Sequence, residues 1–566
     1  MRQSQHSSPP YVYSPQKPRQ AIPRLLTIGI IVLVLLLGIG FRSFNLGKKA
    51  YWVDEVHTSV RISGYTKADV TDSRFDNQIH SVADLEAYQI PSQTRSLGDV
   101  LNALVQHPEH PPLYYLMAHW WVQAAIAMGV PPSVAIARSL ALLFSVLAIP
   151  CVIGFVRELF RSNLTATIAF SIFALSPLHV LYGQEARAYS LWTLVTVLSC
   201  WTFLRAVRLS TLRSWLLYGL TLTIGWYSHL LFATVAIAQA LYFFLFVPRA
   251  PDQEKPKLQS FGLIFATSLL LFSPWIAVFF FHFSQVQNVV EATQQNPSLG
   301  YLLSTWGRNL SRVWFGDDLG SINILVFLAT IYGLVYLWQT TSRRISGFLL
   351  LLISINALAL MLPDMVTGGI SSTRIRYLLP AYMGIQLAIA HLFSHRIEYY
   401  ALPQHLIKPL VKQAWKIGLI SVLLGGAIAG CIGLTQTTNW AKSDKSFYYP
   451  KMAQVINASD HPLVITDNSA TYTLALTHYL DKHVHLQLVD LQRLQKPQDL
   501  VIPMAIDGDT IDDLFLFAPS PPLHRLVKKR IENPEEGQNY GLLTAVVQQS
   551  DRFQLLQTKH SFQTDS

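Results

Sequence analysis

Residues 134–157 read VAIARSLALLFSVLAIPCVIGFVR, a run whose only charged residues, Arg138 and Arg157, lie near its two ends. About 20 predominantly apolar residues are what an α-helix needs to cross the hydrocarbon core of a bilayer. Similar runs recur along most of the chain, in which 51% of the 566 residues are hydrophobic and only 13% are charged. That composition leaves too little polar surface for a soluble fold of this length. The sequence therefore predicts an α-helical polytopic membrane protein.

The basic residues fix the expected topology, because lysine and arginine gather on the cytoplasmic side of membrane proteins. Their positions agree with a cytoplasmic N-terminus only if an odd number of spans separates the loop 44–111 from Arg157. The apolar stretch 112–129 is therefore interpreted as a helix lying at the membrane interface. About eleven spans remain, near residues 22–41, 134–157, 164–181, 188–206, 214–228, 230–247, 260–283, 321–339, 346–362, 376–394 and 415–434.

This parity predicts a multi-pass protein of the cell (inner or plasma) membrane with its C-terminal part outside. Beyond the last span, the β-rich runs Leu463–Thr466 and Val484–Val489 alternate with an expected helix near 469–480, which indicates a small soluble α/β domain. The expected parts are a basic cytoplasmic tail, a transmembrane domain that includes the first outer loop 44–129, and an extracytoplasmic domain, at residues 1–23, 24–435 and 436–566.

The first outer loop opens with Asp54 and Glu55, two adjacent carboxylates flanked by aromatic residues just beyond the first span. A carboxylate near an apolar wall has a raised proton affinity and can serve as a general base. The alternative is a solvated pair of loop residues. Further along, Glu109 and His110 precede the interfacial helix within HPEHPPLYY, residues 107–115. Clustered His and Glu can bind a divalent metal, but this spacing matches no closed site, and a helix-capping turn is the other interpretation.

Two further outer segments carry charges. Glu185 and Arg187 lie between two apolar spans with almost no loop to solvate them, which is costly unless they pair or face a wet cavity. Arg374 and Arg376 lie at the mouth of a later span, where a planar guanidinium suits the oxygens of a phosphate. Arginines that merely snorkel to the interface are the alternative for this pair.

Two single residues complete the set of candidates. His229 falls at an outer turn, although a lone histidine is more often structural. Arg138 opens the second span, where it can reach the same cavity or pair with an acid of the loop. The unusual acids and arginines thus gather on one predicted face of the membrane.

Taken in order, five elements resemble the protein O-mannosyltransferase-like glycosyltransferases, the polytopic GT-C class of family 39 type that includes the lipid A aminoarabinose transferases. They are the Asp54–Glu55 pair, the HPPLYY segment, Arg138-Ser-Leu, the QEARAY turn at 184–189 and RYLLP from Arg376. The resemblance covers roughly residues 24–435. Unlike the eukaryotic protein mannosyltransferases, this chain has no large module inserted between spans. The resemblance therefore supports a protein acceptor less strongly than a lipid or glycan acceptor.

The resemblance implies transfer of a sugar from a polyprenyl-phosphate carrier to a lipid, glycan or protein acceptor outside the membrane, with inversion. Asp54 would then take the catalytic position and Glu55 its neighbour. Arg374 and Arg376, with Tyr377, would hold the lipid phosphate. The pocket for donor and acceptor would be shaped by Glu109, His110, Arg138, Glu185, Arg187, Tyr189 and His229. No nucleic acid is expected as a partner and no cofactor is assigned, with a divalent metal left open.

Two other functions remain open from the sequence. A transporter or flippase of lipid-linked saccharides tends to place charges and broken helices near the bilayer midplane and to show inverted repeats. The charges of this chain cluster at one face, and no repeat is visible. A non-catalytic envelope scaffold is the second alternative, which would tolerate replacement of the outer carboxylates.

Overall fold

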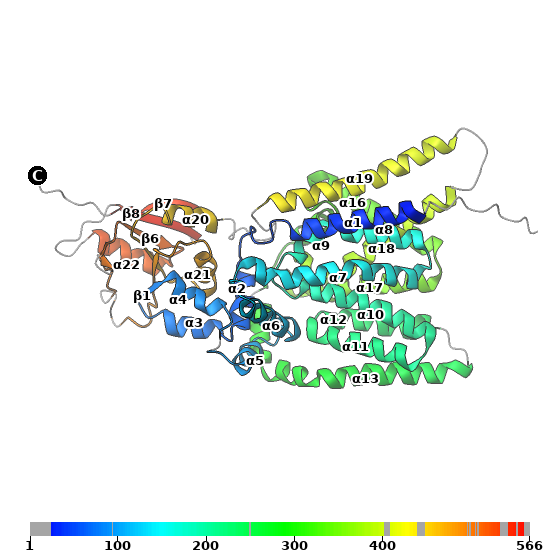
Figure 1. Cartoon of the computed structure of the whole chain (residues 1–566), viewed down its shortest axis with the longest axis horizontal. Coiled ribbons are helices and arrows are strands. Elements are labelled where there is room, and N and C mark those ends of the chain that lie inside the picture. The colour runs from blue at the N-terminus through cyan, green and yellow to red at the C-terminus, as the bar shows by residue number, and fades with distance from the viewer. Residues whose placement is uncertain are drawn as a thin grey trace, which may run out of the picture.

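A computed structural model describes residues 24–92, 94–247, 251–291, 293–400, 408–437, 448–494, 496, 500–503, 505–506, 509–532, 542–550 and 553–559. The predicted basic tail 1–23 lies outside these residues. Figure 1 shows a bundle of long, roughly parallel helices, a small domain of sheet and helices at one end, and a layer of short helices between the two. We call this end of the bundle the capped end.

All eleven predicted spans are helical. They correspond to α1 (Arg24–Ser43), α7 (Val134–Phe160), the pair α8 (Asn163–Ala174) and α9 (Pro177–Gly183), α10 (Tyr189–Leu209), α11 (Leu212–Ser228), α12 (Phe232–Phe246), α13 (Pro251–Phe281), α16 (Asn323–Thr340), α17 (Arg343–Thr367), α18 (Leu379–Tyr400) and α19 (Lys408–Gln436). Among the described residues, six helices are long and apolar enough to cross a membrane, or seven when the bent pair α8–α9 counts as one. Three shorter apolar helices lie within α1, α12 and α19. The number of eleven crossings stays a prediction.

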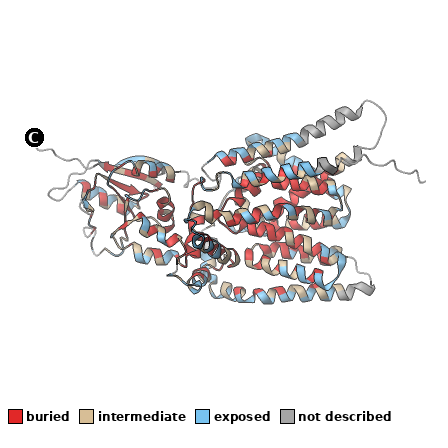
Figure 2. Cartoon of the chain, viewed as in Figure 1, coloured by how far each residue is buried: buried red, intermediate tan, exposed pale blue. Residues whose placement is uncertain are grey.

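Burial divides the bundle into central and peripheral helices (Figure 2). α18 and α10 are the most enclosed candidate spans, because 94% and 72% of the residues in their most apolar segments are buried. In α13 only 17% of the residues in that segment are buried. Leu270 and Phe281 of α13 are largely exposed. Large apolar side chains on the rim of a helix bundle suit a lipid environment. α10 and α18, whose first residues lie at the capped end, form the centre of the bundle.

The span predicted near 164–181 is not one straight helix. α8 ends at Ala174, α9 begins at Pro177, and their axes differ by 54°. Pro177 has no N–H to continue the ladder of α8 and disfavours a helical conformation at Ser176, whose backbone is extended (φ −70°, ψ 121°). The turn 184–188 that follows α9 is consequently drawn into the protein.

The layer at the capped end contains α2 (Val53–Ile62), α3 (Lys67–Arg74), α4 (Val82–Glu86), α5 (Leu97–Val105) and α6 (Leu113–Ala127). Figure 1 shows α6 nearly end-on, so it runs across the end of the bundle, in keeping with the interpretation of 112–129 as a helix that does not cross with the others. α14 (Phe283–Glu291), α15 (Leu299–Phe315) and the 3₁₀ turns η1 (Ala87–Gln89), η2 (Gly320–Ile322), η3 (Ser371–Thr373) and η4 (Ile375–Leu378) complete the helical part.

The C-terminal domain is the predicted α/β domain. Its six-stranded sheet has the order β1-β3-β2-β6-β8-β7, in which β2 pairs in parallel with β3 and β6. The strands are β1 (Ile79–Ser81), β2 (Pro462–Thr466), β3 (His485–Leu488), β6 (Asp513–Phe517), β7 (Thr544–Ser550) and β8 (Phe553–Lys559), with a separate ribbon of β4 (Ala505–Ile506) and β5 (Asp509–Thr510). α20 (Tyr449–Ile456) and α21 (Ala470–Thr477) share one apolar core, and α22 (Pro521–Glu532) packs into the other.

The first outer loop belongs to this sheet as much as to the bundle. β1 comes from the loop and pairs antiparallel with β3, with His80 opposite Leu486. Val56 and Val60 of α2 lie in the same apolar core as Val464 and Leu474. Assignment of residues 44–129 to the transmembrane domain alone is therefore corrected. The loop buries its apolar residues against the C-terminal domain, a pairing of distant segments that no local pattern signals.

Candidate active site

Asp54 lies in the first turn of α2 and points toward the start of α18. Its Oδ2 is 3.3 Å from Nη2 of Arg376, and 22% of its side chain is exposed against 11% for that arginine. The guanidinium of Arg376 lies over the rings of Trp52, Tyr189 and Tyr377, with centroids 5.3 to 5.9 Å from its central carbon. An accessible carboxylate thus stands beside a cation held in place by aromatic rings.

Arg187 reaches the same point from the turn after α9. It is 6% exposed, and its Nη1 donates to the backbone carbonyl of Asp54 at 3.2 Å and to Thr58 Oγ1 at 3.4 Å. The fully buried Glu185 interacts electrostatically with both Arg187 and Arg376. The bend between α8 and α9 is what brings this pair of charges inward.

Aromatic residues also lie close to Arg187 and Arg376. His229 stacks on Trp192, with ring centroids 4.4 Å apart, and lies 5.9 Å from the ring of Tyr189 and 6.4 Å from that of Tyr377. Arg374 lies over the ring of Tyr377 at 6.0 Å. The structure therefore brings Asp54, Glu185, Arg187, Tyr189, His229, Arg374, Arg376 and Tyr377 together at the capped end.

Glu55 and Arg138 pair with each other, which is the second of the two interpretations of Arg138, a pairing with an acid of the loop. Both are fully buried, and Arg138 donates from Nε and Nη2 to the two carboxylate oxygens of Glu55, each at 2.7 Å. Ala186 N–H donates to the same carboxylate at 3.0 Å. Arg138 also donates to the carbonyls of Leu46, Lys49 and Ala50. Glu55 is thus not an open carboxylate, because its buried oxygens are occupied by Arg138 and by the backbone N–H of Ala186.

Glu109 and His110 form a second group beside the first. Glu109 Oε1 is 3.5 Å from His107 Nδ1 and 3.7 Å from His110 Nε2. Burial would raise the pKa of Glu109, but the hydrogen bond from His107 and the charge of Arg61 lower it overall. Burial together with the charges of Arg61 and Arg187 holds the pKa of His110 well below its usual value. Across the described residues, no three His, Cys, Asp or Glu side chains are grouped closely enough to hold a metal ion.

Three residues near Asp54 were not predicted from the sequence, namely Trp52, His57 and Arg61. The signal that would have found the last two is helical spacing, because Asp54, His57 and Arg61 follow one another at intervals of three and four residues along α2. Those positions lie on one face of a helix. The segment was interpreted as the opening of a loop, for which spacing carries no such meaning.

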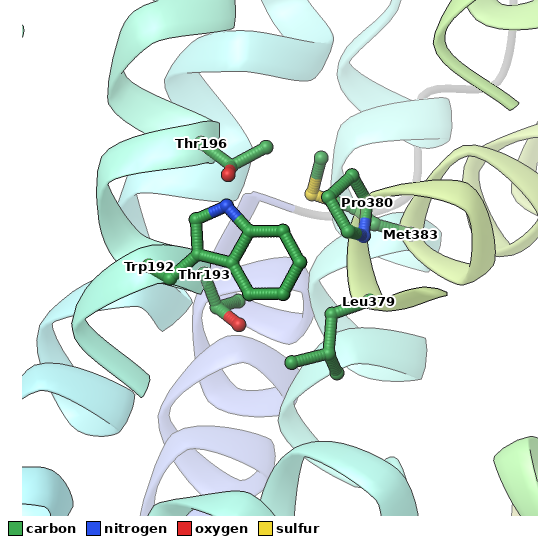
Figure 3. A pocket seen from close by; sticks show the side chains of 6 residues that line it. All are labelled: Trp192, Thr193, Thr196, Leu379, Pro380 and Met383. Carbon is green, nitrogen blue, oxygen red and sulfur yellow. The ribbon is translucent and has the colours of Figure 1, made fainter. Parts of the chain in front are cut away.

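A narrow gap, too small for a water molecule, lies between α10 and α18, deeper in the bundle than Tyr189. Figure 3 shows it lined by Trp192, Thr193, Thr196, Leu379, Pro380 and Met383. Within the described part of the chain, Trp192 Nε1 and Thr196 Oγ1 have no hydrogen-bond partner. The lining is otherwise largely apolar.

Residues 109–277 match the family described as dolichyl-phosphate-mannose-protein mannosyltransferase. The resemblance to the GT-C glycosyltransferases is confirmed. The matched segment carries Glu109, Arg138, Glu185 and Arg187, whereas Asp54 and Arg376 lie outside it. The family is one of membrane glycosyltransferases, and glycosyltransferase activity is what the match supports for this chain.

Three solved structures show a weaker likeness, and no curated protein matches the chain. ArnT from Cupriavidus metallidurans in the apo state is 13% identical over 94% of this chain and 97% of that chain, with a TM-score of 0.47. Archaeal oligosaccharyltransferase AglB from Archaeoglobus fulgidus, in complex with an inhibitory peptide and a dolichol-phosphate, is 14% identical over 87% and 69%, with a TM-score of 0.47. The S. cerevisiae protein O-mannosyltransferase Pmt1-Pmt2 complex bound to the sugar donor is 14% identical over 47% and 35%, with a TM-score of 0.31.

Proposed function

We propose that this protein transfers a sugar from a polyprenyl-phosphate-linked donor to the hydroxyl or amine of an acceptor, with inversion and with Asp54 as general base. The observation that carries the proposal is the ion pair of 3.3 Å between Asp54 and Arg376. A base for the incoming nucleophile and a cation for the departing phosphate are the two groups that this reaction requires.

The chemistry follows from that pair. The acceptor oxygen or nitrogen attacks the anomeric carbon of the donor sugar. The bond between this carbon and the phosphate oxygen breaks, and the proton of the acceptor moves to Asp54. The electron pair of the broken bond stays on the phosphate, which Arg376 and Arg374 stabilise as it leaves. A single displacement of this kind inverts the anomeric carbon. In the absence of donor Arg376 neutralises Asp54, and a bound phosphate competes for the same guanidinium and releases the carboxylate.

The other site residues support this assignment by their positions. Arg187 positions the backbone of Asp54, because its guanidinium donates a hydrogen bond to the Asp54 carbonyl. Tyr189 and Tyr377 keep Arg376 in place by their rings.

We assign the capped end to the outer side of the cell membrane, in line with the distribution of basic residues in the sequence. Three segments predicted to be outer meet there, namely the loop 44–129 and the segments that carry Arg187 and Arg376. Arg187 and Arg376 both contact Asp54, and Trp306 of α15 donates to Ser372 Oγ at 3.0 Å. A lipid-linked donor would reach the site from within the membrane and the acceptor from outside.

The test is complementation of cells that lack the protein with wild type, Asp54→Asn and Asp72→Asn, followed by mass spectrometry of their glycolipids and glycoproteins. Asp72 is an exposed acid of the same loop, with 77% of its side chain accessible, so it serves as the matched control. Wild type and Asp72→Asn should restore the product, whereas Asp54→Asn should leave a polyprenyl-phosphate sugar to accumulate. Normal product with a well-expressed Asp54→Asn protein overturns the proposal.

A further inference from the structure

The face of α2 that begins at Asp54 continues past His57 to Arg61. Arg61 is 4% exposed, and its central carbon lies 6.0 Å from the centroid of the Tyr115 ring. Within the part of the chain that the structure describes, Arg61 Nη1 has no hydrogen-bond partner. A buried donor without a partner costs about 1–3 kcal/mol, more when it is charged, so such a group indicates a ligand that completes it.

Glu109 presents the matching acceptor. Its Oε1 faces His107 and His110, while its Oε2 is buried and has no partner among the described residues. Both groups lie around the ring of Tyr115. The central carbon of Arg61 is 6.0 Å from the centroid of this ring, and the ring of His110, whose Nε2 is 3.7 Å from Glu109 Oε1, lies 5.9 Å from it. Asp54 lies on the same face of α2 as Arg61, and Arg187 donates to the backbone carbonyl of Asp54. A buried donor and a buried acceptor without partners thus lie around one ring, on the side of α2 that carries the proposed base.

The charges around this region balance and so favour a neutral ligand over an ion. The two guanidinium groups of Arg61 and Arg187 stand against the two carboxylates of Glu109 and Asp54. Burial and the charge of Arg61 lower the pKa of His57 to about 3, and His110 is shifted in the same direction, so both imidazoles are neutral near pH 7. A neutral imidazole donates from one nitrogen and accepts at the other. The region therefore suits groups that both donate and accept hydrogen bonds.

We propose that Arg61 and Glu109, with the ring of Tyr115, form a subsite for the hydroxyl groups of a sugar and so orient that sugar beside Asp54. The inference rests on the proposed function and adds two specificity-determining residues to it. A hydroxyl that accepts from Arg61 Nη1 and donates to Glu109 Oε2 satisfies both groups at once. The sugar can be that of the donor or one on the acceptor, and binding experiments separate the two sources.

The experiment uses the full-length protein in nanodiscs and compares wild type, Arg61→Gln, Glu109→Gln and Arg95→Gln. Arg95 is the matched control, because it also stacks on a tyrosine, at 4.1 Å from the Tyr65 ring, but has 34% of its side chain exposed. The probes are dolichyl phosphate and dolichyl phosphates carrying mannose or glucose, measured by equilibrium binding. Methyl mannoside and methyl glucoside are tested by saturation-transfer NMR.

If the donor sugar occupies the subsite, Arg61→Gln and Glu109→Gln weaken binding of a sugar-bearing lipid by about 5- to 30-fold, the equivalent of one lost hydrogen bond, and change dolichyl phosphate binding less than twofold. If an acceptor sugar occupies it, lipid binding is unchanged and the methyl glycoside signal disappears in both variants. Arg95→Gln behaves as wild type in either case.

Equal weakening of all lipids, or no change with any probe, overturns the subsite. So does a wild-type protein that binds no sugar-bearing lipid better than dolichyl phosphate and gives no glycoside signal. Normal transfer by Asp54→Asn together with a selective loss of sugar binding in Arg61→Gln would instead refute Asp54 as the base while the subsite stands. The two failures are thereby distinguishable.

Discussion

Arg138 of α7 holds both carboxylate oxygens of Glu55 of α2 at 2.7 Å, and both side chains are fully buried. The ion pair joins the bundle to the helix that carries Asp54. Because Glu55 is committed to Arg138, Asp54 is the one of the two adjacent acids that is partly exposed, and it lies beside Arg376. One acid thus holds the helix, and the other is the proposed base.

Removal of one partner of this pair should destabilise the protein strongly. Arg138→Met leaves the Glu55 carboxylate buried without compensation, which typically costs about 3–5 kcal/mol. Thermal unfolding in detergent should show a much lower midpoint for Arg138→Met than for the double variant Arg138→Met/Glu55→Gln, in which the buried charge is absent. Equal midpoints for the two variants would contradict the ion pair.

Replacement of Asp54 should abolish transfer without loss of the fold. General base catalysis contributes about 10²–10⁴-fold, so Asp54→Asn should lower the transfer rate by that factor. The thermal midpoint should stay close to that of wild type, because 22% of the side chain is exposed and its ion pair with Arg376 is not fully buried. Rates with Asp72→Asn, measured in the same preparation, provide the control.

Arg376 should matter for the lipid phosphate itself. Arg376→Gln removes the cation beside Asp54, and we expect binding of dolichyl phosphate to fall by at least about tenfold, because charge-assisted hydrogen bonds are worth about 1.5–3 kcal/mol. This loss should be seen with and without an attached sugar. Unchanged affinity for dolichyl phosphate would remove Arg376 from the phosphate site.

The protein should lose stability at mildly acid pH through His478. Burial and the charge of Arg138 lower the pKa of His478 from 6.5 to about 3. The folded state therefore binds fewer protons than the unfolded chain, so the stability is complete above pH 6.5 and is lost as the pH falls toward 3. Between pH 7.5 and 5 this group should cost roughly 1–2 kcal/mol. His478→Gln should show a smaller drop in thermal midpoint over that range, and an equal drop would contradict the assignment.

The C-terminal domain should influence catalysis through Tyr51. The backbone N–H of Tyr51 donates to the Tyr479 hydroxyl at 2.5 Å, and the Tyr51 ring lies 4.2 Å from that of His478. Tyr479→Phe removes the hydroxyl that accepts the hydrogen bond from the Tyr51 N–H, and Tyr51 lies three residues before Asp54. We therefore expect a several-fold lower turnover and a loss of stability of about 1 kcal/mol. Tyr301→Phe, at an exposed tyrosine of α15, should change neither turnover nor the thermal midpoint.

Much of the fold could be predicted because the signals are local. The length and apolarity of each span can be read directly from consecutive residues, and all eleven predicted segments are helical. The strands β2 and β3 follow apolar runs in the same way. Prolines usually indicate a turn or loop, but α22 begins at Pro521, because proline is well tolerated in the first turn of a helix.

The candidate site could be predicted only in part. Asp54, Arg187 and Arg376 were proposed from short motifs, and the structure brings them into contact. Arg61 was not predicted as a site residue because residues 53–62 were interpreted as a loop. Only in a helix does its spacing from Asp54 place the two side chains on one face.

Consecutive residues alone suffice to predict that this chain enters a membrane and which charges are too costly to leave unpaired there, because both follow from the free energy of transferring residues out of water. Which of the two adjacent acids is accessible depends instead on the fold. Arg138, the partner of Glu55, lies 83 residues away along the chain, and β1 pairs with a strand some four hundred residues later. Such contacts depend on how separate elements pack, and no local pattern of residues encodes them.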